Sequence, residues 1–102
     1  MKLYISRPKK GIEAVCEFSP EAKTFTVLQG SRVSTEIAHS EKFRGAASIL
    51  KSRAGSVKDR IVINDIVFKS ASTAANYVTG SSTNGLTAWK NEKGISLKEI
   101  LK

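Results

Sequence analysis

The side chains that most often carry out catalysis are scarce in this chain. His39 is the only histidine and lies beside Ser40 and Glu41 in a polar stretch, which favours an exposed loop or helix-cap position over a general base. Cys16 is the only cysteine and lies on an expected strand without a histidine partner, which favours a buried thiol over a nucleophile. Segment 80–85 lacks the Lys-Ser/Thr ending of a phosphate-binding P-loop. We therefore expect no enzyme activity, no cofactor and no metal site.

The basic residues offer a different chemistry, because they are unevenly distributed. The chain of 102 residues carries a net charge of +8, from 17 Lys and Arg against 9 Asp and Glu. Residues 1–10 hold four cations and no acid, residues 11–41 hold two cations and five acids, and residues 42–60 hold six cations and one acid. Clustered Lys and Arg gain free energy by releasing counterions from phosphates. A polyanionic partner is therefore one interpretation, and simple solubility is the other.

A run of hydroxyl and amide side chains between Lys69 and Lys90 is a second feature that could hold a ligand. Ser70 precedes an expected helix over 71–79, whose first N–H groups favour anions. Segment 81–85 supplies further donors after the helix ends, about 13 Å away. Helix capping by Ser70 explains the first group better than a ligand does. At 81–85 the two explanations are balanced, because five small polar residues exceed the needs of a simple turn.

An earlier helix is expected to carry part of the second basic block. Apolar residues recur at helical spacing from Phe43 to Ala54, with Ser40 as the N-cap and Gly55 after the end. The cations of this helix flank its apolar stripe and are Lys42, Arg44, Lys51 and Arg53. A helix that reads a DNA groove would carry its cations on the outer face. We therefore favour the explanation that the aliphatic parts of these Lys and Arg side chains cover apolar surface of the protein.

The remaining patterns predict an antiparallel sheet. β-Branched and aromatic runs between turn residues indicate strands at 13–18, 24–28, 60–63, 66–68 and 86–90. The turns between them predict two hairpins, the second around Asn64-Asp65. A capping box at Ser96 predicts a short helix over 97–101. The order β-β-α-β-β-α-β predicts one α+β domain over residues 1–102, with a small antiparallel sheet and two or three helices packed on one face.

Two aromatic residues are candidates for stacking on bases. Trp89 is the only tryptophan and lies in an expected strand, where a core position is favoured over a stacking role. Tyr77 falls just off the apolar face of the helix over 71–79. We expect it to be partly exposed and the better stacking candidate of the two.

No segment of the sequence predicts export or membrane insertion. The apolar run at the N-terminus ends after Ile5 without a cleavage signal, and no apolar stretch approaches the roughly 20 residues that cross a bilayer. A lone Cys16 forms no internal disulfide, which is typical of a reducing compartment. We expect a soluble cytoplasmic protein without a membrane partner.

A spaced pattern in the second half of the chain is similar to that of a known family. It consists of Val67-Phe68-Lys69-Ser70-Ala71-Ser72-Thr73-Ala74-Ala75 followed by Gly80, Asn84-Gly85, Trp89-Lys90, Gly94 and Leu97. With the strand and Gly-Ser step at 25–31, it resembles the domain of unknown function 4357 family over about residues 25–102. A similar pattern occurs in modules attached to restriction-type adenine methylases.

The resemblance implies a role near DNA, since the family's own function is unassigned. Its members often lie C-terminal to a GIY-YIG nuclease domain, which implies proximity to DNA and not catalysis. Here Tyr4-Ile5-Ser6 is not that nuclease motif. Ala71 stands where proline is common, and Leu86 stands where an aromatic residue is common. The second departure removes a potential stacking platform.

Two functions are compatible with these patterns. The first is a non-catalytic nucleic-acid-binding accessory module, with DNA favoured over RNA, weak sequence specificity and a separately encoded nuclease or methylase as a further partner. Its phosphate contacts are expected from Lys2, Arg7, Lys9, Lys10, Arg44, Lys51, Arg53, Lys58, Lys69 and Lys90. Its loop donors are expected to be Ser81, Ser82, Thr83, Asn84 and Gly85. The alternative is a protein–protein interaction module whose basic charge serves solubility.

Overall fold

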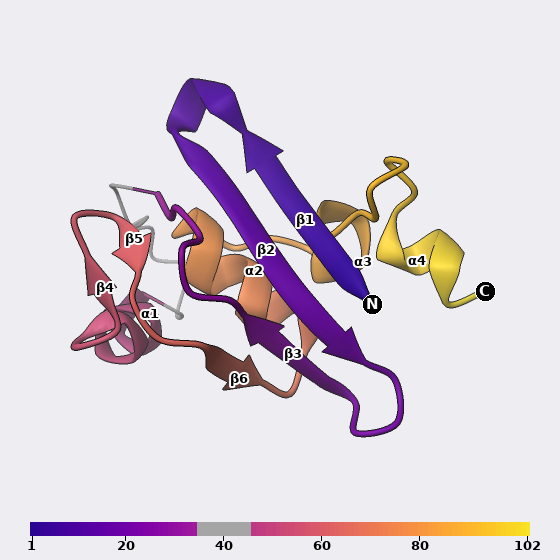
Figure 1. Ribbon diagram of the computed structural model, residues 1–102, viewed down its shortest axis with the longest axis horizontal. Helices are drawn as coiled ribbons and strands as arrows, with labels where there is room; N and C mark the ends of the chain where they lie inside the picture. Colours follow the sequence, from indigo (N-terminus) through magenta and orange to yellow (C-terminus); the bar gives the residue numbers. More distant parts are fainter. Residues whose placement is uncertain (35–45) are drawn as a thin grey trace.

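An antiparallel sheet of four strands is the largest element of the molecule (Figure 1). The structure is a computed structural model and describes residues 1–34 and 46–102. The strands, in their order across the sheet, are β1 (Lys2–Arg7), β2 (Ile12–Ser19), β3 (Thr24–Val27) and β6 (Ile66–Phe68). The predicted α+β class and the predicted hairpin between 13–18 and 24–28 are both confirmed.

Strict alternation of side chains decides which face of the sheet is buried. In β1 and β2, Leu3, Ile5, Ile12, Ala14 and Cys16 are buried, whereas their neighbours in sequence are exposed or half-buried. Successive side chains of a strand point to opposite faces, so these residues lie on one side of the sheet. The opposite face meets solvent.

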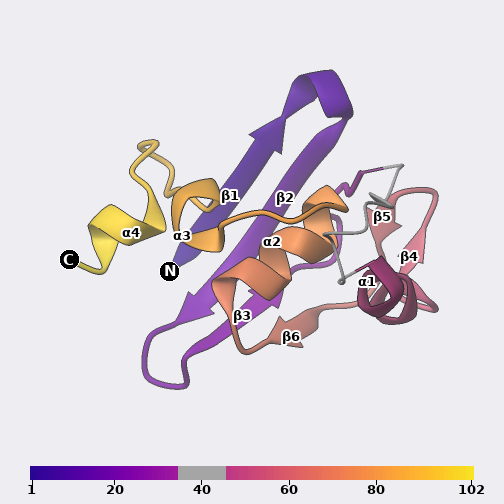
Figure 2. The same cartoon turned by 180° about the vertical axis from the view of Figure 1, so that it is seen from behind.

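The helices cover the buried face of the sheet, as Figures 1 and 2 show for α2 and α3. The helices are α1 (Ala46–Arg53), α2 (Ala71–Thr79), α3 (Gly85–Ala88) and α4 (Leu97–Ile100). The largest fully buried side chains come from both layers and include Trp89, Tyr77, Leu3, Ile12 and Leu97. The Cα radius of gyration is 12.5 Å, and a compact unit of this length has about 13 Å.

The ends of α2 agree with the sequence pattern. The Ser70 hydroxyl accepts a hydrogen bond from the Thr73 amide at 3.0 Å, which satisfies one of the unpaired N–H groups of the first turn. Gly80 has φ 72° and donates its N–H to the Asn76 carbonyl. A left-handed residue of this kind ends helices because glycine adopts it without a steric penalty.

The predicted hairpin around Asn64-Asp65 is wrong. The strand before that turn, β5 (Ile61–Val62), pairs with β4 (Val57–Lys58), and the strand after it, β6, pairs with β3. The Asp65 carboxylate instead accepts the Gln29 amide at 2.8 Å. This contact between distant segments directs the chain away from a local hairpin and onto the edge of the main sheet.

The predicted strand over 86–90 is also wrong, because this segment begins with a helical turn. Asn84 caps α3 by accepting the Leu86 amide, and Trp89 ends the turn. No strand was expected over 2–7, where the structure has β1. The described part of the helix expected over 43–54 is α1. None of the described helices is long and apolar enough to cross a membrane.

Candidate nucleic-acid interface

Two neighbouring hairpin turns gather basic side chains at one end of the molecule. The β1–β2 turn is the 3-10 segment η1 (Pro8–Lys10), followed by Gly11, and it protrudes beyond the other elements in Figures 1 and 2. The β4–β5 turn contains Asp59 and Arg60, both with positive φ. The cations of these turns and their flanks, here called the basic tip, are Arg7, Lys9, Lys10, Arg32, Lys58 and Arg60.

Backbone pairing brings the distant members of the basic tip together. Arg32 exchanges both backbone hydrogen bonds with Glu13, at 2.7 and 3.0 Å, and also bridges to Ile61. The guanidinium of Arg60 reaches the β1–β2 turn, where its Nη2 lies 3.0 Å from the position that a Cβ on Gly11 would occupy. Residues from three separate segments of the sequence therefore meet at this end.

Among the described residues, no acidic side chain lies within ion-pair distance of a cation of the basic tip. Within residues 1–34 and 46–102 the ion pairs join the N-terminal amine to Glu17 at 3.4 Å and Lys102 to Glu99 at 3.6 Å, and neither involves the tip. Glu13 accepts the Ser6 hydroxyl at 2.7 Å instead of binding a cation. In the part of the chain that the structure describes, six cations thus face two carboxylates, Glu13 and Asp59, in this region. Such an excess attracts polyanions.

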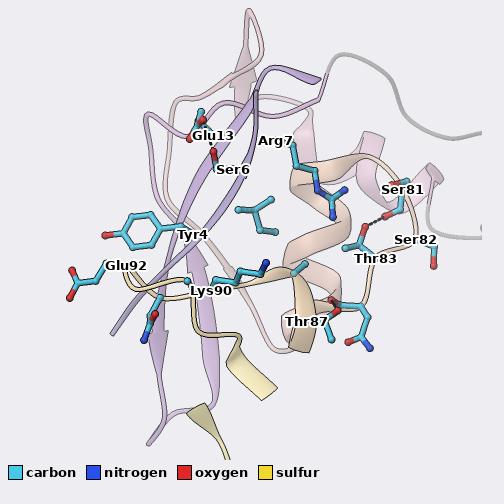
Figure 3. A pocket seen from close by; sticks show the side chains of 15 residues that line it. Tyr4, Ser6, Arg7, Glu13, Ser81, Ser82, Thr83, Thr87, Lys90 and Glu92 are labelled. Atoms are coloured by element: carbon cyan, nitrogen blue, oxygen red, sulfur yellow. Dashed lines mark hydrogen bonds between the residues drawn. The ribbon is translucent and has the colours of Figure 1, made fainter. Parts of the chain in front are cut away.

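A groove of about 840 Å³ adjoins the basic tip. It lies between β1 on one side and the 81–84 loop with α3 on the other. Arg7 and Lys90 point into the space between these walls, whereas Tyr4 and Glu92 point away from it (Figure 3). The groove therefore presents cations to its interior and turns its aromatic ring outward.

The 81–85 loop is held mainly by hydrogen bonds to side chains of α2. The Thr83 amide binds the Asn76 side chain at 2.8 Å, and the Thr83 and Thr79 hydroxyls are 2.8 Å apart. The Gly85 amide binds the Ser72 hydroxyl at 3.0 Å. A Cβ at Gly85 would overlap the backbone of Ala71, so only glycine allows α3 to lie so close to α2.

These contacts leave few loop groups for a ligand. The amides of Thr83 and Gly85 and the oxygen of the Asn84 side chain are engaged within the fold. Among the described residues, the hydroxyls of Ser81 and Ser82 have no protein partner, and both line the groove. Structural roles therefore account for Thr83, Asn84 and Gly85, while Ser81 and Ser82 remain candidates.

The guanidinium of Arg53 makes hydrogen bonds within the fold. Its Nε and Nη2 bind the Tyr77 carbonyl at 3.1 and 2.7 Å, and its Nη1 binds the Ser34 carbonyl at 3.0 Å. Burial lowers the pKa of this guanidinium. Carbonyls near the end of α2 thus occupy the donors that the sequence suggested for phosphate.

The aromatic candidates are both buried. Trp89 is fully buried and donates its Nε1–H to the Ala71 carbonyl at 3.0 Å, which confirms its predicted core position. Tyr77 is 1% exposed, so the expectation of a partly exposed stacking residue is wrong. Its ring lies 5.1 Å from that of Phe68, and burial raises the pKa of its hydroxyl. Neither ring is available to a base.

The other predicted site residues lie apart from the basic tip. Lys2 is exposed opposite Glu17 in the sheet, Lys51 is exposed on α1, and Lys69 is exposed before α2. Arg44 and His39 lie outside the described residues. Cys16 is buried, and desolvation raises the pKa of its thiol to about 12. In the part of the chain that the structure describes, no group of three His, Cys, Asp or Glu residues could hold a metal ion.

Arg32 and Arg60 are the members of the basic tip that sequence reasoning missed. Arg32 falls in the acidic block of the sequence, and Arg60 was counted in the basic block 42–60 and at the start of a strand but not among the expected phosphate contacts. Their proximity to Lys9 and Lys10 depends on pairing between distant segments, which charge counts along the chain do not report.

Comparison with known proteins places the chain in a family. No curated protein and no solved structure shows significant similarity to it. A family model described as domain of unknown function (DUF4357) matches residues 3–101. The match includes β1, which the resemblance over about 25–102 left out. The chain therefore belongs to the DUF4357 family.

Proposed function

We propose that this protein is a non-catalytic accessory module that binds nucleic acid through the phosphate backbone, with DNA as the favoured target. The observation that carries the proposal is the basic tip, where cations from three segments converge without an acidic partner within ion-pair distance among the described residues. Phosphate contacts by Lys and Arg supply sequence-independent affinity. Their position on two protruding turns lets a phosphate backbone approach without a clash with the sheet.

Weak sequence specificity follows from the chemistry of the same surface. Specificity comes from side chains that reach base edges, whereas phosphate contacts only position the protein. The open face of the sheet offers little to a base, because Glu13 and Glu17 repel phosphates and Tyr4 is the one aromatic residue among the described side chains of that face. The module is expected to act in the cytoplasm beside a separately encoded nuclease or methylase, which would supply the chemistry.

Fluorescence anisotropy with labelled DNA over about 50 to 300 mM salt tests the proposal. Contacts to about five phosphates predict that log K falls with log salt at a slope of about −4 to −5 on duplex DNA. Reversal of Lys9 and Lys10 to Glu is expected to abolish most of this binding. The matched control reverses Lys69 and Lys98, which are exposed away from the basic tip, and has the same net charge.

A loss that is equal in both double variants would mean that total charge, and not the basic tip, controls binding. Absence of binding at the lowest salt concentration would contradict the proposal. It would favour the second candidate, a protein–protein interaction module. That candidate draws support from β6, an edge strand on which Val67 is 61% exposed, because exposed apolar edges pair with partner strands.

A further inference from the structure

The outer edge of β1 opens into the groove. Tyr4 exchanges both of its backbone hydrogen bonds with Lys90, at 2.7 and 3.0 Å. In an antiparallel strand the backbone groups two residues further on point the same way, so the N–H and C=O of Ser6 also face outward. No residue of the described chain binds them, and Ser6 lines the groove. The groove therefore has one backbone donor and one acceptor on its β1 wall.

Charged and hydroxyl groups surround this donor and acceptor. Arg7 and Lys90 point into the groove from different ends (Figure 3). Lys90 pairs with Tyr4. Tyr4 is three residues from Arg7, which corresponds to about 10 Å along β1. The hydroxyls of Ser81 and Ser82 lie on the facing wall. The two cations therefore enter the groove from separate backbone positions, so they can bind different phosphates of one strand.

The size of the groove selects the form of nucleic acid. A volume of about 840 Å³ is suited to a small ligand and is too small for a duplex. Bases in a duplex are stacked and paired, so only an unpaired nucleotide can enter such a site. Because Arg7 belongs to both the groove and the basic tip, a strand bound at the tip can continue into the groove.

We propose that the groove between β1 and the 81–84 loop binds an unpaired nucleotide of a strand whose neighbouring phosphates contact the basic tip. Arg7 and Lys90 bind phosphates, and the backbone of Ser6 hydrogen bonds the base edge. The inference rests on the proposed function and specifies its substrate as single-stranded nucleic acid or the unpaired end of a duplex.

An extended peptide fits the same edge less well. A peptide that adds a strand to a sheet depends on a row of backbone hydrogen bonds. Here the row is short, because the backbone of Lys90 already binds the N–H and C=O of Tyr4 and the chain turns into η1 at Pro8. One residue, Ser6, remains to pair with such a peptide, whereas the edge of a single base needs no more than a donor and an acceptor.

The test compares a blunt DNA duplex with the same duplex carrying a single-stranded tail, by fluorescence anisotropy. The tail is expected to tighten binding about tenfold through added phosphate contacts. Lys90→Glu is expected to remove this gain and leave blunt-duplex affinity within about twofold. Lys93→Glu is the matched control, because Lys93 is exposed near the groove but does not line it.

The outcomes separate this inference from the proposed function. Equal affinity for blunt and tailed duplexes, or an equal loss for both in Lys90→Glu, would overturn the groove site while duplex binding at the basic tip stands. No binding to either DNA would overturn both.

A backbone NMR titration locates the ligand directly. A short oligothymidylate is expected to shift the amide signals of Ser6, Ser81 and Lys90. Shifts confined to the open face of the sheet would contradict the proposal. A poly-glutamate peptide that shifted the same three signals at lower concentration would also contradict it, because the groove would then prefer a peptide.

Discussion

Arg53 binds the carbonyl oxygen of Tyr77 with two of its nitrogens, Nη2 at 2.7 Å and Nε at 3.1 Å. The same guanidinium lies 5.9 Å from the centre of the Tyr77 ring. Two elements that are distant in sequence, α1 and α2, are thereby joined by one side chain. Charge-assisted hydrogen bonds to backbone carbonyls are among the stronger polar contacts in a small protein.

Replacement of Arg53 by Met is therefore expected to lower the free energy of unfolding by about 2 to 3 kcal/mol, because several carbonyls lose a charged donor. Urea denaturation measures this change. Lys51→Met, an exposed position on the same helix, serves as the control and is expected to change stability by less than about 0.5 kcal/mol. Similar losses in the two variants would show that the contacts of Arg53 contribute little.

Gly85 is expected to be intolerant of any side chain. A Cβ there would overlap the backbone of Ala71, and the backbone must shift to relieve the overlap. Gly85→Ala is expected to lower the thermal midpoint clearly and to cost about 3 kcal/mol. Gly55→Ala is the control, since Gly55 has φ +78° but open space around it, and left-handed backbone alone costs about 1 kcal/mol. A milder effect at Gly85 than at Gly55 would contradict the close approach of α3 to α2.

The thiol of Cys16 is expected to be inert in the folded protein. Its pKa of about 12, against an ordinary value of 9.0, arises mainly from burial, with the negative charge of Glu17 adding to it. At pH 8 a thiol reagent should therefore react only as fast as the protein unfolds, and urea should release the reaction. Rapid labelling without urea would contradict the burial of this residue.

The same pKa difference predicts a loss of stability in alkali. Between pH 9 and 12 the unfolded chain releases the Cys16 proton while the folded chain retains it, so the folded state binds more protons. Stability should then fall as pH rises, by up to about 1.4 kcal/mol per pH unit from this group. Urea midpoints measured across this range for the protein and for Cys16→Ala give the contribution. The variant should show the weaker pH dependence.

Local patterns predicted the parts of the fold that local contacts determine. Ser70 and Gly80 marked the ends of α2 because capping involves neighbours in sequence. The strand expected over 86–90 was wrong because Asn84 caps a helical turn and Gly85 allows close packing on Ala71. That packing partner is distant in sequence, so no local pattern reported it.

In the candidate site, too, local features were predicted and contacts between distant residues were not. Lys9 and Lys10 are adjacent in sequence, were expected among the phosphate contacts from their charge, and are exposed in the structure. Arg60 joins them through its reach to Gly11, a contact between distant segments that no local pattern indicates. Arg53 was expected among the phosphate ligands, because charge alone does not tell a free guanidinium from one that binds carbonyls. Strand pairing determines where Arg60 lies, and burial against backbone carbonyls determines what Arg53 binds.

The β4–β5 turn allows a test of the basic tip with two substitutions of opposite effect. Asp59 and Arg60 both have positive φ, at 52° and 69°, and asparagine tolerates this conformation. Arg60→Asn removes a cation and should weaken DNA binding about equally for all sequences, with a salt slope smaller by about 1. Asp59→Asn removes a carboxylate beside that cation and should strengthen binding. Because both variants keep the backbone of the turn, their stabilities should match, and circular dichroism melts check this. If the DNA affinity measured by anisotropy changed in the same direction for both variants, phosphates would not contact this turn.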